Sequence, residues 1–66
     1  MDDVNERRST EIAIRFLEAD RLKLIADIGF LVLEEEWLLV SEYAIQLRIL
    51  DTKLELLKKV LEKLPL

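Results

Sequence analysis

The sequence predicts an all-α protein, and three observations support this fold class. Of the 66 residues, 52% are apolar and 36% are charged, and there is one glycine and one proline. The hairpins and tight turns of β proteins need residues such as glycine and proline at defined backbone angles, which excludes an all-β fold. Apolar residues also recur at helical spacing along most of the chain. A single domain over residues 1–66 is expected, since a chain this short holds one small core.

A first helix is expected over about residues 4–28. Asp3 and Glu6 have the spacing of a capping box, which marks a helix start. Ile12, Phe16 and Ala19 share one face of this helix, and a neighbouring face is also apolar. Charged residues occupy the remainder of the surface: Arg15, Glu18, Arg21 and Lys23.

A turn is expected at about residues 28–33, around the only glycine, Gly29. Glu34, Glu35 and Glu36 would then form the first turn of a second helix, where the helix macrodipole favours negative charge. The segment otherwise lacks turn-forming residues, and a glycine inside a helix costs only about 1 kcal/mol. One continuous long helix in a coiled-coil oligomer is therefore the alternative.

The second helix is expected over about residues 34–64, and it carries the strongest pattern in the sequence. Eight apolar residues follow the 3-4 spacing of a heptad repeat, and we call them the leucine seam: Val40, Tyr43, Leu47, Leu50, Leu54, Leu57, Leu61 and Leu64. A second row, the outer stripe, runs along another side of the same helix: Leu38, Ile45, Ile49, Leu56 and Val60. A helix that is apolar on two sides needs at least two neighbours to cover it.

These patterns predict a long helical hairpin that assembles into a multi-helix bundle, with a dimeric four-helix bundle as the smallest form that covers both rows. The first helix is expected to cover the outer stripe, and the leucine seam is expected to meet another chain. Trp37 is added to the interface because tryptophan is enriched at binding hot spots. The predicted interface residues are therefore the eight of the leucine seam with Trp37, Ile45, Ile49 and Leu56.

The function that follows is helical self-association, with another copy of the chain as the partner. One alternative is a coiled-coil adaptor subunit that joins other helical chains in a larger hetero-complex. Another is an engineered helical bundle with no natural function, because the segment from Lys53 to Leu64 combines strong helix formers, leucines and alternating charge.

Several other functions are not expected from this composition. The chain has no histidine and no cysteine, so we expect no enzyme, no metal site and no cofactor. Its formal net charge of −4 argues against nucleic acid. No stretch of about 20 predominantly apolar residues predicts a membrane span, and no motif indicates a small-molecule substrate. The lack of cysteine fits a reducing compartment, so an intracellular, cytoplasmic protein is expected.

Overall fold

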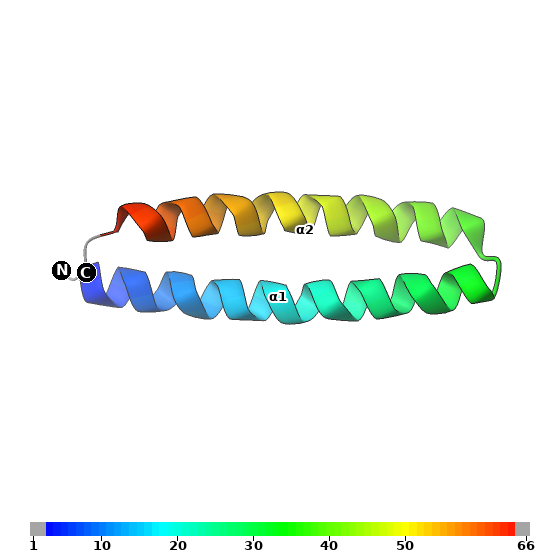
Figure 1. Ribbon diagram of the computed structural model, residues 1–66, viewed down its shortest axis with the longest axis horizontal. Coiled ribbons are helices and arrows are strands. Elements are labelled where there is room, and N and C mark those ends of the chain that lie inside the picture. The colour runs from blue at the N-terminus through cyan, green and yellow to red at the C-terminus, as the bar shows by residue number, and fades with distance from the viewer. Residues whose placement is uncertain (1–2, 65–66) are drawn as a thin grey trace.

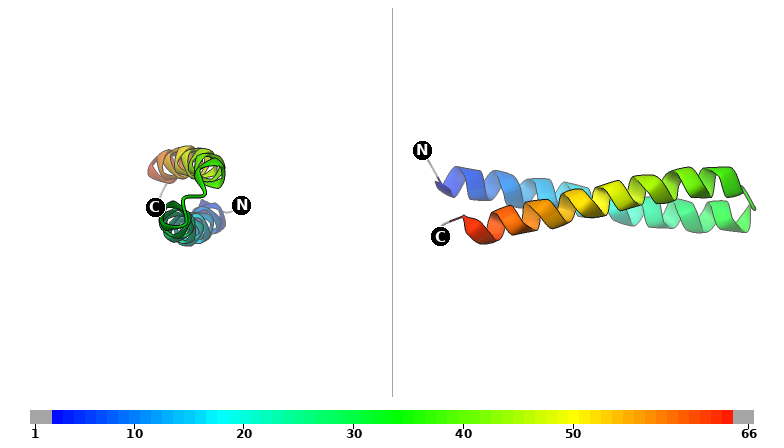
Figure 2. Two further views of the ribbon diagram at one scale, coloured as in Figure 1. Left: turned by 90° about the vertical axis from the view of Figure 1, so that its right-hand side faces the viewer. Right: turned by 90° about the horizontal axis from the view of Figure 1, so that it is seen from above.

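The chain folds as a helical hairpin. The computed structural model describes residues 3–64, which form two helices, α1 (Asp3–Leu33) and α2 (Trp37–Lys63). The helices run antiparallel, side by side, over a length of 50 Å, and the hairpin is only 15 × 14 Å across (Figure 1). Figure 2 shows that they cross at a shallow angle along their length. The prediction of an all-α hairpin is confirmed, and the single continuous helix is excluded.

Helix α1 is longer than the sequence predicted, because it continues through Gly29 to Leu33. The turn expected at residues 28–33 is therefore wrong. Ile28 and Leu31 explain the difference, since both side chains are partly covered by the second helix and would lose that contact if α1 ended early. Their burial outweighs the cost of one helical glycine, which is about 1 kcal/mol.

The turn consists of Glu34, Glu35 and Glu36, which were expected to begin the second helix. The Glu36 N–H donates to the Leu31 carbonyl at 3.0 Å and the Glu35 N–H donates to the Val32 carbonyl at 3.0 Å. These two bonds form a Schellman motif, which satisfies the last carbonyls of α1. Glu35 has φ 57°, the left-handed conformation that this motif requires. The acidic triplet therefore closes the first helix, and no acidic residue lies in the first turn of α2.

Replacing Glu35 by glycine is expected to stabilise the hairpin by about 1 kcal/mol. A residue with a Cβ atom costs about 1–2 kcal/mol in the left-handed conformation, and glycine avoids this cost but loses part of the gain as chain entropy. Thermal unfolding followed by circular dichroism should show a rise of about 4–8 °C. Glu34→Gly is the matched control, because Glu35 alone among the described non-glycine residues has positive φ. A lower melting temperature for Glu35→Gly than for Glu34→Gly would contradict this account.

The helices meet along two rows of residues with the same spacing. On α2 the row is the leucine seam. On α1 a second 3-4 series, which we call the α1 seam, consists of side chains that are all at least partly covered: Arg7, Thr10, Ile14, Leu17, Arg21, Leu24, Ile28 and Leu31. Because the helices are antiparallel, the two series stand opposite each other layer by layer, as in an antiparallel coiled coil. At the end away from the turn, the Arg7 guanidinium donates to the Leu64 carbonyl at 3.4 Å.

The α1 seam differs from the expectation for the first helix. Arg21 was assigned to the charged remainder of the surface, but it occupies a layer between Leu17 and Leu24. Three of the eight positions are polar, so the apolar pattern alone did not reveal the row. The spacing is nevertheless regular, and it becomes visible once Arg7, Thr10 and Arg21 are counted with their neighbours.

Candidate association surface

The leucine seam lies inside the hairpin. All eight of its residues are buried or half-buried, and Leu54 has only 5% of its surface exposed. Leu54 and Ile14 of the α1 seam, the latter 8% exposed, are the two buried apolar residues in the part of the chain that the structure describes. The first helix was expected to cover the outer stripe, and that assignment is wrong. A helix with its own heptad series packs best against another heptad series, so α1 covers the leucine seam.

The outer stripe is consequently exposed, together with Trp37. Four of the residues expected at the interface lie here, and their exposed fractions are large: Trp37 58%, Ile45 61%, Ile49 52% and Leu56 58%. These four residues are available to another chain in the folded hairpin. The eight residues of the leucine seam make their contacts within the chain and would support association only by holding the helices together.

Exposed apolar side chains are present on both helices. Fourteen large apolar residues of the described chain are exposed: Ile12, Phe16, Leu22, Ile25, Phe30, Val32, Leu33, Trp37, Leu38, Leu39, Ile45, Ile49, Leu56 and Val60. Two packed helices form a rod without an interior, so each helix can cover only the side that faces the other. Large exposed apolar areas on soluble proteins mark sites of interaction, so the outer surface of the hairpin is a candidate association surface.

The solvent-accessible area shows how much more surface the hairpin exposes than a compact protein of the same mass. The hairpin exposes 5363 Å². A compact monomer of 7.8 kDa is expected to expose about 4,400 Å². The difference of about 1,000 Å² is similar to the roughly 800 Å² that each partner buries in a protein interface of standard size.

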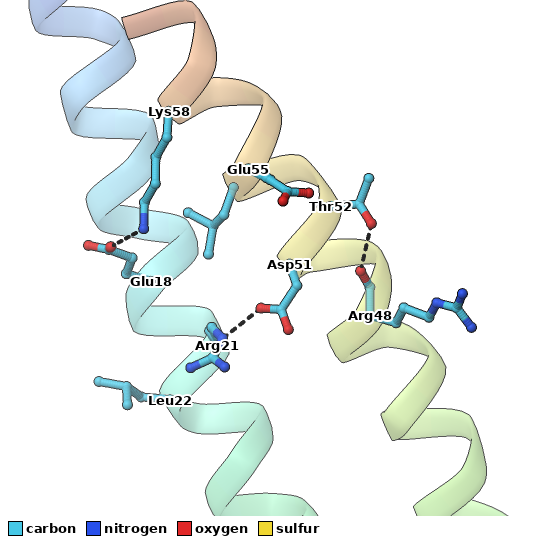
Figure 3. A pocket seen from close by; sticks show the side chains of 9 residues that line it. Glu18, Arg21, Leu22, Arg48, Asp51, Thr52, Glu55 and Lys58 are labelled. Carbon is cyan, nitrogen blue, oxygen red and sulfur yellow. Dashed lines mark hydrogen bonds and ion pairs between the residues drawn. The ribbon is translucent and has the colours of Figure 1, made fainter. Parts of the chain in front are cut away.

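One face of the hairpin carries ion pairs between the helices, and we call it the salt-bridge face. Arg21 Nε donates to Asp51 Oδ1 at 2.6 Å, and Lys58 Nζ lies 3.4 Å from Glu18 Oε2 (Figure 3). A shallow groove runs between these residues, and Leu22 also lines it. The side chains are about half exposed, so each pair stabilises the fold by only about 0–1 kcal/mol. The pairs therefore help to align the two helices but add little to stability.

The opposite face of the hairpin has a second groove, and we call it the groove face. The middle of this groove is lined by Ile49 and by five polar residues from both helices: Asp20, Lys23, Asp27, Gln46 and Lys53. Phe16 and Phe30 lie one heptad before and after Lys23, so they are on the same face. The groove face thus has a charged middle and apolar residues toward both ends.

Neither groove has an arrangement that indicates catalysis or metal binding. Within residues 3–64, no group of three or more histidine, cysteine, aspartate or glutamate residues is placed to hold a metal ion. The hydroxyls of Thr10 and Thr52 donate to the carbonyls of Glu6 and Arg48, four residues earlier in their own helices. Neither described helix is long and apolar enough to span a membrane. Exposed apolar area is the feature that distinguishes this surface.

Comparison with known proteins adds no relative, since no protein-family model, no curated protein and no solved structure matches the chain.

Proposed function

We propose that this protein is a helical self-association module, whose partner is a second copy of the same hairpin. The observation that carries the proposal is that, among the residues described, fourteen large apolar side chains are exposed whereas only two are buried. Burying apolar area stabilises an assembly by about 25 cal/mol per Å² removed from water. The outer surface of the hairpin, and not its leucine seam, would provide that area.

The size of the chain supports the same proposal. A chain of 66 residues buries only about 60% of the surface that its unfolded chain exposes, a smaller share than larger domains bury, and is marginally stable alone. Small scaffolds without disulfides or metals are commonly stabilised by oligomerisation or by unusually regular helix packing. Two hairpins in contact would form a four-helix bundle with an interior, which a single hairpin lacks.

Size-exclusion chromatography with light scattering tests the proposal. We expect a mass of twice 7.8 kDa at micromolar concentration, with a circular dichroism spectrum typical of a fully helical protein. A fully helical monomer under these conditions would overturn self-association. A poorly helical or polydisperse chain would also contradict it, and would favour an adaptor that folds with a different helical partner.

A further inference from the structure

The groove face carries apolar residues at similar distances on both sides of its middle, although Leu56, one heptad after Ile49, has Glu42 as its counterpart one heptad before. On α1, Phe16 and Phe30 each lie seven residues from Lys23, a distance of about 10 Å at 1.5 Å per residue. On α2, Leu39 lies ten residues before Ile49 and Val60 lies eleven residues after it. Lys23 and Ile49 line the same groove, so they are at the same level of the hairpin. A twofold axis through this level would place the apolar residues of one end over those of the other end.

The charges in the middle of the groove face cancel within each copy. Asp20 and Asp27 carry two negative charges, and Lys23 and Lys53 carry two positive charges. The middle of the face is therefore neutral in each copy. Contact between the middle parts of two groove faces would bring carboxylates and ammonium groups together in equal number. Neither positive nor negative charge is then in excess at the centre of the interface.

The net charge of the chain is confined to the turn end. Residues 28–43 contain four glutamates, at 34, 35, 36 and 42, and no lysine or arginine. Their formal charge of −4 equals the net charge of the whole protein. Two copies with both turns at the same end would bring eight carboxylates together. Turns at opposite ends of a rod 50 Å long are separated by several Debye lengths, which are about 8 Å each at physiological ionic strength.

From these three features, we infer that the second copy docks on the groove face with its turn at the opposite end of the bundle. The twofold axis is perpendicular to the length of the hairpin, at the level of Lys23 and Ile49. The Phe16 end of each copy therefore covers the Phe30 end of the other. Lys63 then lies at the level of the acidic turn of the second copy, because Lys63 and Glu35 are equally far from Ile49 along the chain. This arrangement rests on the proposed function and gives it a surface and an orientation.

The salt-bridge face does not fit a second copy equally well. Its exposed apolar residues lie beside the ion pairs or on the turn side of them: Leu22, Ile25, Val32 and Trp37. Its half away from the turn is charged, with Glu18 and Lys58 among its residues. Two such faces would match apolar to apolar only with both turns at the same end, where the eight carboxylates would repel.

The orientation is tested by pulsed electron paramagnetic resonance on the full chain carrying a nitroxide at Glu34→Cys. We expect a label-to-label distance of about 35 Å, because Glu34 lies eleven residues, about 17 Å, from the level of Lys23 in each copy and neighbouring helix axes are about 10 Å apart. Chains labelled at Glu34→Cys, refolded together with chains labelled at Ser9→Cys, should give a second distance below about 25 Å, since neighbouring helix axes are about 10 Å apart. A short distance between two Glu34→Cys labels in a dimer would overturn the orientation and leave self-association standing.

The face is tested by a matched pair of lysine substitutions on α1. Phe30 on the groove face and Leu22 on the salt-bridge face are 63% and 67% exposed, so neither substitution removes a contact of the hairpin core. Phe30→Lys should raise the dimer dissociation constant by more than about tenfold, because it puts a charge into a buried apolar contact. Leu22→Lys should leave the constant within about twofold.

Helicity of both variants at high protein concentration shows that the hairpin still forms. Dissociation of Leu22→Lys with retention of the Phe30→Lys dimer would overturn the groove face as the docking site. A monomeric unsubstituted chain would instead overturn the proposed function itself.

Discussion

Leu54→Ala is expected to lower the free energy of unfolding by about 3 kcal/mol, which is the largest effect predicted for a single substitution in this chain. Leu54 is the most deeply buried residue described, with 5% of its surface exposed. Truncating a core leucine removes its transfer energy and leaves a cavity, at a cost of about 2–5 kcal/mol. The total stability of a domain this small is about 3–10 kcal/mol, so a large part would be lost.

Urea unfolding followed by circular dichroism at one fixed protein concentration measures this effect. Leu22→Ala is the matched control, since it deletes the same atoms from a side chain that is 67% exposed. The control should change stability by less than about 0.5 kcal/mol, helped by the high helix propensity of alanine. Equal losses for the two variants would contradict the placement of the leucine seam between α1 and α2.

Arg21→Leu is expected to stabilise the hairpin by about 1–2 kcal/mol. Arg21 occupies a layer of the α1 seam, where leucine would pack against the leucine seam, as Leu17 and Leu24 do in the adjacent layers. The lost ion pair with Asp51 contributes little, because the two side chains are 41% and 46% exposed. Asp51 stays hydrated after the change, so no unpaired charge is buried.

The melting temperature of Arg21→Leu should therefore rise by about 4–8 °C or more. Arg21→Ala is the comparison variant, because it removes the same ion pair and also the packing of the arginine stem, and it should lower the melting temperature. A fall in stability for Arg21→Leu would mean that the ion pair with Asp51 outweighs a layer of apolar packing.

The second helix could be predicted from the sequence more fully than the first. Its leucine seam is apolar at all eight positions, so heptad spacing identified the row that the structure places between the helices. The α1 seam includes Arg7, Thr10 and Arg21, while α1 also has apolar residues such as Phe16 and Phe30 on other sides. Apolar periodicity therefore gave no single face for α1. The sequence predicted that α1 covers the outer stripe of α2, whereas it covers the leucine seam.

The turn could not be placed from local sequence preferences. Gly29 is the strongest local signal for a break, but it lies inside α1, where a Cβ atom would meet nothing within 4 Å. The chain turns instead at Glu35, a residue that seldom adopts positive φ. The position is set by the pairing of Ile28 and Leu31 with the opposite helix, which is a tertiary effect. The apolar residues of the candidate surface were visible in the sequence, but which of them stay exposed depended on that pairing.

The Schellman turn also bears on how fast the hairpin forms. The layer nearest the turn joins Leu31 to Val40, a separation of nine residues, whereas the Arg7–Leu64 bond spans 57. The entropy lost on closing a loop grows with its length, so the layers at the turn form at the lowest entropic cost and each later layer extends an existing contact. Folding should therefore nucleate at the turn and proceed toward the termini. Substitutions at Glu35 would then change the folding rate, and substitutions at Arg7 mainly the unfolding rate.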